Sequence, residues 1–128
     1  MVTRKKTYSK KLELSDFDLG WLVGMIEGEG NMACMIGKKK YGSYLGTTIS
    51  ISSTDKDIID RLEKLIPSGR TAYKREPKVA HHKTQYVWNV NKRQEVRSIT
   101  ETILPYLSDR RKEQFGNALQ TIIEYENG

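Results

Sequence analysis

The amino-acid sequence predicts an α+β fold in which helices cover one face of an antiparallel sheet. The predicted elements follow the order helix, strand, strand, helix, strand, strand, helix. Two hairpins of one sheet would give the apolar stripes of the helices a single surface to cover, which leaves the other face polar. With 128 residues the chain is long enough to bury a core, and we expect one domain over residues 12–128.

The first helix is predicted to begin after Ser15 and to run to about Glu27. Serine is a favoured N-cap, and Asp16 and Asp18 would place negative charge at the positive end of the helix dipole. Strand-like segments follow at residues 31–38 and 44–53. Because side chains alternate across a strand, Ile49 and Ile51 would share one face of the second segment, opposite Thr48, Ser50 and Ser52.

A second helix and a second hairpin continue the pattern. The helix starts at Thr54 or Asp55 and ends before "PSG", and one stripe on it carries Ile58, Ile59, Leu62 and Ile66. The hairpin pairs residues 70–75 with residues 84–91 around a tip that contains Pro77, His81 and His82. In its second strand we expect Tyr86, Trp88 and Val90 to face inward, and Gln85, Val87 and Asn89 to face outward. Two helices close the chain, at residues 93–104 and 109–125.

Composition and charge narrow the classes of function. The chain has 22 Lys and Arg against 16 Asp and Glu, a formal charge of +6 that favours a polyanionic partner. Its apolar run at residues 19–26 is far shorter than the ~20 residues that span a membrane. Residues 1–11 form a basic arm without the apolar segment of a secretory signal, and there is one cysteine, Cys34. We therefore expect an intracellular protein with no membrane contact.

The outward face of the predicted sheet suits nucleic acid. It carries hydroxyl, amide and basic side chains and no acid, and these are the groups that contact phosphates and read base edges in a major groove. An antiparallel sheet can also simply show a polar face to water. We expect double-stranded DNA as the partner, rather than a small-molecule substrate. The predicted contacts on this face are Thr48, Ser50, Ser52, Arg70, Lys74, Arg75, Gln85 and Asn89.

The segment "WLVGMIEGEG", Trp21 to Gly30, has too many glycines for an ordinary helix. An interior glycine costs a helix about 1 kcal/mol relative to alanine. Gly24 and Gly28 are four residues apart and share one helix face, which allows a second helix to approach closely. The simpler interpretation is that Gly30 is a C-cap and the other two are tolerated. The paired spacing favours helix packing.

The same segment ends in two acids, Glu27 and Glu29, which should point in different directions because residues two apart do not share a helix face. Glu29 is expected past the last full turn, where a carboxylate meets the unfavourable end of the helix dipole. A hard cation bound there would relieve this. A solvated acid at a helix end is the simpler alternative.

"LVGMIEGEG", Leu22 to Gly30, closely resembles the LAGLIDADG motif of homing endonucleases. Other segments resemble the same family: "ISISSTDKDIIDRLEKLI" its second strand and following helix, "YVWNV" its fourth strand, and "ILPYLSDRRKEQF" the stretch with a basic active-site residue. The resemblance covers about residues 15–125. It implies the family's αββαββα core, an antiparallel sheet with helices on one face.

The resemblance also implies a homodimer and a metal site. Family members with a single motif pair through the small residues of the motif helix, which here places Trp21, Gly24, Met25 and Gly28 at the interface. The last acid of the motif, Glu29, would bind Mg²⁺ beside the scissile phosphate together with Gly28, and Mn²⁺ would substitute. The sheets of the two subunits would lie over successive major grooves.

Further roles follow from the resemblance. Arg110 would lie beside the phosphate, and Ser53 would orient the attacking water. Asn31, Met35 and Lys39 on the first strand would join the DNA contacts. The family usually has aspartate at Glu29 and lysine at Arg110, and Ser53 is a short side chain for its role. Because Arg111 and Lys112 adjoin Arg110, which of the three contacts the phosphate stays open.

Two functions are consistent with these features. The first is a site-specific, magnesium-dependent, homodimeric DNA endonuclease that cuts a long near-palindromic site and is encoded within an intron or similar mobile element. The alternative is a LAGLIDADG-like DNA- or RNA-binding protein without cleavage, such as a maturase or a transcription factor. Glu29 favours the nuclease, because a protein that only binds needs no acid beside a phosphate; maturases can nevertheless retain the acid.

Overall fold

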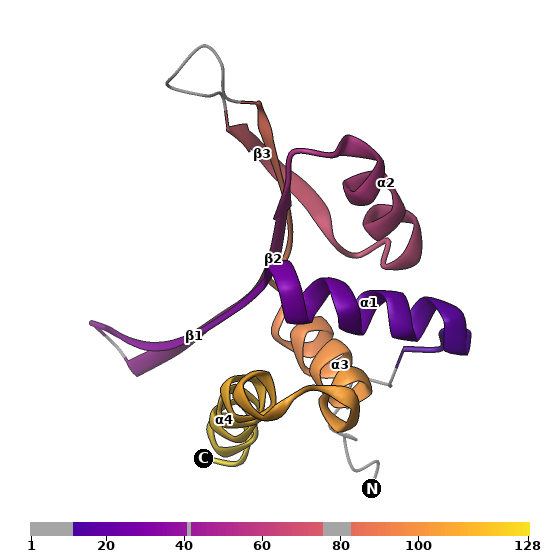
Figure 1. Cartoon of the computed structure of the whole chain (residues 1–128). Coiled ribbons are helices and arrows are strands. Elements are labelled where there is room, and N and C mark those ends of the chain that lie inside the picture. Colours follow the sequence, from indigo (N-terminus) through magenta and orange to yellow (C-terminus); the bar gives the residue numbers. More distant parts are fainter. Residues whose placement is uncertain (1–11, 41, 76–82) are drawn as a thin grey trace, which may run out of the picture.

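A computed structural model describes residues 12–40, 42–75 and 83–128 and confirms the α+β fold (Figure 1). Four antiparallel strands form one sheet in the order β1-β2-β4-β3. The helices lie on one side of this sheet, and no described element covers its other face (Figure 1). The elements are α1 (Asp16–Glu29), β1 (Gly30–Lys39), β2 (Gly42–Ser53), α2 (Lys56–Leu65), β3 (Arg70–Arg75), β4 (Gln85–Val90), α3 (Arg93–Ile103), the 3₁₀ turn η1 (Leu104–Tyr106) and α4 (Asp109–Asn127).

Helix α1 begins as the sequence predicts and ends later. The Asp18 N–H donates to the Ser15 hydroxyl at 3.1 Å, which confirms Ser15 as the N-cap. The predicted end at about Glu27 was two residues short, and Glu29 is the last residue of the helix rather than a residue beyond it. This difference sets where the Glu29 carboxylate lies relative to the sheet.

Gly30 is the C-cap of α1, as the simpler interpretation assumes, and its N–H donates to the Ile26 carbonyl, but it joins α1 directly to β1. Its φ of −79° is not left-handed. A Cβ at this position would lie 2.7 Å from the Ile26 carbonyl oxygen and 2.8 Å from the Ile26 Cα. Glycine is therefore needed because the first residue of the strand passes against the last turn of the helix.

The strand register confirms the predicted faces of β2, with one difference in burial on β4. Ile49 and Ile51 are fully buried, whereas Thr48 across the strand is partly exposed. Val87 faces outward with Ser52, as predicted, but its side chain is nevertheless buried, with only 6% exposed. It lies on β4, which is flanked on both sides by strands, so its small side chain is covered by neighbours.

The core lies between the sheet and the helices. Trp88 on β4 is its largest fully buried side chain, and each helix adds apolar residues to the same cluster. The Trp88 indole lies so close to Gly69 that a Cβ there would come within 2.3 Å of the ring. Residues that line this core include Leu22, Ile26, Ile49, Ile51, Ile59, Leu62, Ile66, Val90, Val96, Ile99, Ile103, Phe115 and Ile122.

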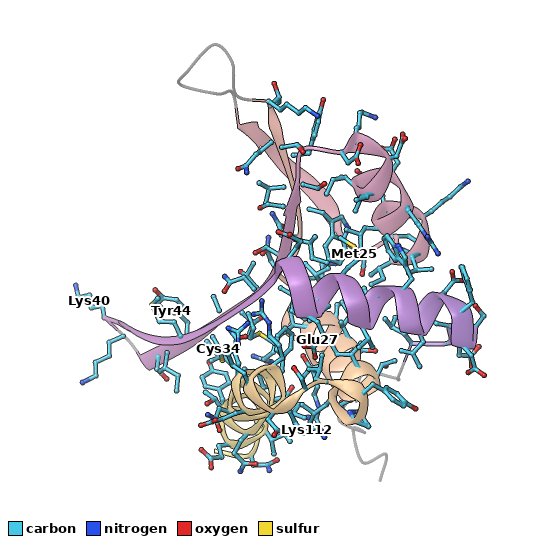
Figure 2. All side chains as sticks on the ribbon, in the orientation of Figure 1. Met25, Glu27, Cys34, Lys40, Tyr44 and Lys112 are labelled. Atoms are coloured by element: carbon cyan, nitrogen blue, oxygen red, sulfur yellow. The ribbon has the colours of Figure 1, made fainter. Side chains whose placement is uncertain are left out.

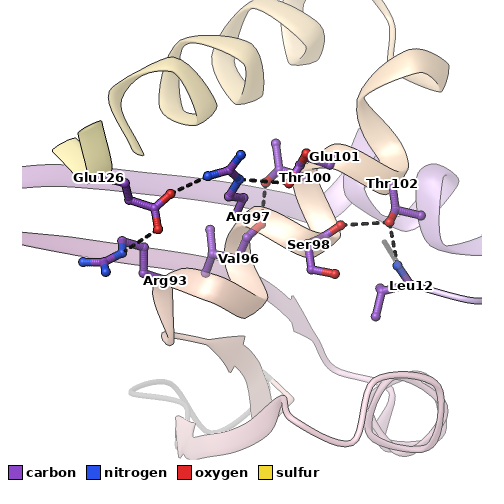
Figure 3. A network of polar contacts seen from close by, with 9 residues as sticks. All are labelled: Leu12, Arg93, Val96, Arg97, Ser98, Thr100, Glu101, Thr102 and Glu126. Atoms are coloured by element: carbon purple, nitrogen blue, oxygen red, sulfur yellow. Dashed lines mark hydrogen bonds and ion pairs between the residues drawn. The ribbon is translucent and has the colours of Figure 1, made fainter. Parts of the chain in front are cut away.

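A polar network holds the last two helices together (Figure 3). Glu126 near the end of α4 forms ion pairs with Arg93 and Arg97 of α3, at 3.3 Å and 2.5 Å. Arg97 also pairs with Glu101 at 3.0 Å within α3. On the opposite side of α3, the Thr102 hydroxyl accepts from the Leu12 N–H at 2.9 Å, which fixes the chain just before α1. The ion pairs of Glu126 hold α4 against α3.

Several expectations fall on residues outside the described ranges. The basic arm at residues 1–11 and the hairpin tip with Pro77, His81 and His82 belong to this group. In the described part of the chain, no helix combines the length and apolar character needed to cross a bilayer.

Candidate functional site

The C-terminal end of α1 is where the predicted site residues gather, and Glu27 anchors it. The Glu27 carboxylate accepts from the Ser108 backbone N–H at 2.6 Å and from the Ser108 hydroxyl at 2.5 Å. Ser108 is the N-cap of α4, so a carboxylate lies at the positive end of that helix. The hydrogen bonds from Ser108, with the charges of Arg111 and Arg110, lower the pKa of Glu27.

Glu29 lies in a different environment from Glu27, as the two-residue spacing predicts. Its side chain is exposed at the last residue of α1, and among the described residues it makes no hydrogen bond or ion pair. Gly30, the next residue, pairs with Ile51 on β2. Glu29 is thus an exposed carboxylate at the junction between α1 and the sheet.

The basic stretch at the start of α4 divides into exposed and buried residues. Arg111 is only 8% exposed; its Nε donates to the Glu27 carbonyl at 3.4 Å, and its Nη1 donates to the Gln114 Oε1 at 2.8 Å. Arg110 and Lys112 are exposed. Arg111 therefore ties α4 to α1, which leaves its two neighbours as the accessible cations. Figure 2 shows Glu27 and Lys112 near this junction.

Ser53 is the last residue of β2 and lies at the same end of the β1–β2 ladder as Glu29. The register pairs Gly30 with Ile51, so Ser53 lies two residues beyond the end of β1. Its hydroxyl accepts from the Asp55 N–H at 2.9 Å, which shapes the turn into α2. Ser53 has a structural contact that the sequence did not indicate, and the role of orienting water stays a prediction.

The uncovered face of the sheet carries an ordered set of polar side chains. The Thr48 hydroxyl donates to the Asn91 Oδ1 at 3.1 Å, and the Asn91 amide donates to the Asn89 Oδ1 at 3.1 Å. Asn91 was missed because the predicted contacts stop at Asn89, although the alternation reaches it. Asn31 and Ser50 are cross-strand partners on this face. Gln85 and Ser52 lie on it by alternation along β4 and β2, and the side chains of Lys39, Arg70, Lys74 and Arg75 fall outside the described set.

One face of α1 is lined by glycine and contacts none of the residues that the structure describes. Gly20, Gly24 and Gly28 are exposed, and a Cβ at any of them would meet no atom within 4 Å. Gly20 was not predicted as part of this face, although it continues the spacing of four. Beside this face Trp21 is half-buried under the Arg61 guanidinium, 4.1 Å from its ring centroid. Met25 is also half-buried and packs against the core.

Solved structures resemble the chain closely in fold. The archaeal intron-encoded homing endonuclease I-Vdi141I, complexed with DNA, matches 88% of this chain and 71% of its own with a TM-score of 0.69 and 20% identity. The LAGLIDADG homing endonuclease I-LtrWI, bound to target DNA, matches 98% of this chain and 41% of its own, with a TM-score of 0.67 and 19% identity.

A third structure, the homing endonuclease I-CvuI in complex with a DNA target in the presence of 2 mM Mg, with the DNA not cleaved, matches 87% of this chain and 69% of its own with a TM-score of 0.66 and 18% identity. No sequence model of a protein family and no curated protein sequence matches the chain. The likeness is therefore one of three-dimensional structure. The chain has the fold of the LAGLIDADG homing endonucleases.

Proposed function

We propose that this protein is a divalent-metal-dependent DNA endonuclease that acts as a homodimer on a long near-palindromic site. The observation that carries the proposal is the exposed carboxylate of Glu29, which has no partner among the described residues and lies at the edge of a polar sheet face. The fold is shared with enzymes whose structures contain DNA.

The uncovered sheet face supports DNA as the substrate. None of the outward positions of β1, β2 and β4 carries an acid, and the chain as a whole has a formal charge of +6. The Thr48–Asn91–Asn89 hydrogen bonds hold two amides in fixed orientations before any ligand arrives. Amides in fixed positions are suited to the donor and acceptor pattern of the major groove.

The glycine face of α1 supports a dimer. This helix is apolar on most sides, and a helix of that kind is normally covered all round. Within one copy of the chain, the Gly20, Gly24 and Gly28 face is open and Phe17 beside it is 77% exposed. A second α1 packed on this face would cover both. The chain also spans only 41% of I-LtrWI, so two copies would correspond to most of that enzyme.

Glu29 and the Gly28 carbonyl are hard oxygen donors, which fits magnesium. Glu27 is less suited as a ligand than Glu29, because both of its carboxylate oxygens already accept from Ser108. Among the described residues of one chain there is no group of three His, Cys, Asp or Glu that could enclose an ion. A second Glu29 across the dimer, phosphate oxygens and water would complete the ligand set. A bound divalent ion would supply a nucleophilic water at neutral pH and stabilise the leaving oxygen.

The basic residues at the start of α4 complete the proposed site. Arg110 and Lys112 present exposed charge beside the end of α1, held there by Glu27–Ser108 and by Arg111. A fixed cation near the scissile phosphate stabilises the charge that develops during cleavage. We assign this role to Arg110.

A nucleic-acid-binding protein without cleavage is the second candidate. The observation that favours it is the Ser53 hydroxyl, which already accepts from the Asp55 N–H and is short for orienting a water. The two candidates share the sheet face and differ only at the end of α1. Cleavage therefore decides between them.

The test is cleavage of a randomised duplex library by the full chain in magnesium, in calcium and in EDTA, with the products sequenced. Cutting at one long site in magnesium alone supports the endonuclease. Cutting that persists in EDTA overturns the metal requirement. Tight, salt-sensitive binding with no cutting in magnesium favours the second candidate.

A further inference from the structure

The outward face of the β1–β2 hairpin changes from polar to apolar along its length. Near its base, Asn31 lies opposite Ser50. Toward the tip the same face carries Ala33 and Met35 on β1 and Tyr44 on β2, and Met35 is 67% exposed while Tyr44 is 42% exposed. An apolar surface kept this open to water needs a reason.

The register and the contacts of α4 show which face these residues occupy. Met35 pairs with Gly46, and Gly37 pairs with Tyr44, so Met35 and Tyr44 stand on the same side. The alternate residues face α4: the Cys34 thiol lies 3.9 Å from the Ala118 carbonyl oxygen. In Figure 2, Tyr44 lies on the open side of the hairpin and Cys34 on the side of α4.

Tyr44 is held flat against its own hairpin. A Cβ on Gly37 would meet the Tyr44 ring at 2.3 Å, so only glycine lets the ring lie against the opposite strand. Gly37 and Gly46 have no side chains, so Met35 and the Tyr44 ring are the side chains that project from this part of the hairpin face. Exposed Lys40 lies at the tip of the same hairpin, which suits a polyanionic partner (Figure 2).

We propose that Ala33, Met35 and Tyr44 form a specificity-determining patch that reads the 5-methyl groups of thymine in the DNA major groove. This inference rests on the proposed function. The thymine methyl is the one apolar group that a base pair displays in that groove, and apolar side chains read it. The polar base of the hairpin would read hydrogen-bonding edges, and the tip would require A·T pairs at the outer part of each half-site.

The size of the effect follows from the burial of single methyl groups. Burying one methyl-sized group stabilises a complex by ~0.8 kcal/mol, and a tenfold change in affinity corresponds to ~1.4 kcal/mol. Replacing one contacted thymine by deoxyuridine, which removes only the methyl, should therefore weaken binding about fourfold.

The experiment uses the full chain and a duplex selected by binding from a randomised library in calcium. Each thymine of the selected duplex is replaced by deoxyuridine in turn, and binding is measured for wild type, Met35→Ser and Ile36→Ser. Ile36 is the matched control, because it follows Met35 in β1, is 55% exposed and faces the other way. We expect losses at outer thymines in wild type and Ile36→Ser, and no loss at those positions in Met35→Ser.

The outcomes separate this inference from the function it rests on. Tight, salt-sensitive binding that is indifferent to every deoxyuridine, or that keeps its sensitivity in Met35→Ser, overturns the thymine patch and leaves the proposed function standing. Failure to enrich any duplex overturns the proposed function and the inference with it. If Met35→Ser abolishes binding, the deoxyuridine series on wild type decides alone.

Discussion

The Glu27 carboxylate receives two hydrogen bonds from Ser108, one from the backbone N–H and one from the hydroxyl. These bonds join the last turn of α1 to the first residue before α4, across 81 residues of sequence. These bonds also give the two acids of the motif, Glu27 and Glu29, different environments. Glu27 positions a helix, whereas Glu29 two residues later is exposed.

The first prediction concerns the pH dependence of the Glu27–Ser108 contact. The folded pKa of Glu27 lies below its ordinary value of 4.5, so the contact contributes full stability above about pH 4.5 and loses it as the pH falls through the lowered pKa. Glu27→Gln should therefore differ most from wild type in its free energy of unfolding near neutral pH. The difference should shrink in acid. Urea denaturation over a pH series measures it.

Ser108→Ala provides the control for that prediction. It removes the hydroxyl donor and keeps the backbone donor, so the pH-dependent part of the stability should become smaller without vanishing. If Glu27→Gln and wild type lose stability in parallel as the pH falls, the contact does not set the pKa of Glu27.

The second prediction separates binding from cleavage. Glu29→Gln should keep DNA binding and lose cleavage by on the order of a thousandfold, because a metal-bound transition state is stabilised by several kcal/mol. Glu27→Gln is the matched control from the same motif and should still cut where it is folded. Binding by fluorescence anisotropy in calcium and cutting in magnesium are measured on one duplex. Loss of binding in Glu29→Gln would mean that this carboxylate is structural.

Much of the fold could be predicted from the sequence because local patterns specify it. Ser15 capped the first helix as expected, and the alternation in β2 placed Ile49 and Ile51 in the core. Two differences came from tertiary context. The burial of Val87 depends on strands to both sides of β4, and the length of α1 depends on Gly30, which lets the strand begin against Ile26 without a gap.

The candidate site was less predictable, because side chains far apart in sequence decide it. The motif indicated Glu29, but no spacing rule shows that Arg111 turns inward to the Glu27 carbonyl while Arg110 stays exposed. The engagement of Ser53 with Asp55 likewise depends on how the chain turns after β2. Of the exposed glycine face of α1, the spacing predicted Gly24 and Gly28 but not Gly20, which lies on the same face.

The third prediction compares the effects on stability of substituting Gly28, within α1, and Gly30, at the junction between α1 and β1. Gly30→Ala forces a Cβ to within 2.7 Å of backbone, and we expect it to destabilise the chain by about 1–3 kcal/mol. Gly28→Ala meets open space and removes a poor helix former, so the monomeric chain should gain up to about 1 kcal/mol. Urea denaturation at low protein concentration compares them. Equal effects of the two substitutions would contradict the geometry at Gly30.

The fourth prediction concerns assembly through the glycine face. Gly24→Leu adds a side chain where one copy of the chain has free space, so the fold should persist while the approach of a second α1 is blocked. Sedimentation equilibrium should show the wild type as a dimer and the variant shifted toward monomer. Unchanged circular dichroism shows that the fold is retained. A wild type that is monomeric at every concentration would rule out this interface.

The last prediction assigns the basic residues of α4. Arg110→Gln should reduce cleavage by about a hundredfold with stability unchanged, because one fixed charge beside a reacting phosphate contributes on this scale. Lys112→Gln, with an equally exposed neighbouring cation, should keep the cleavage rate and lower only the salt dependence of binding by about one phosphate contact.

Arg111→Gln should behave in a third way, since its side chain is buried against Glu27 and Gln114. The free energy of unfolding should fall by about 1.5–3 kcal/mol, the range for hydrogen bonds to charged groups, and cleavage should fall only as far as the folded fraction does. Single-turnover cleavage and urea denaturation of the three variants give the comparison. If Lys112→Gln loses cleavage and Arg110→Gln keeps it, the phosphate contact belongs to Lys112.

Arg110→Lys tests what the contact requires. If the site needs only a point charge, this variant should retain most of the cleavage rate; if it needs the bidentate guanidinium, the rate should fall.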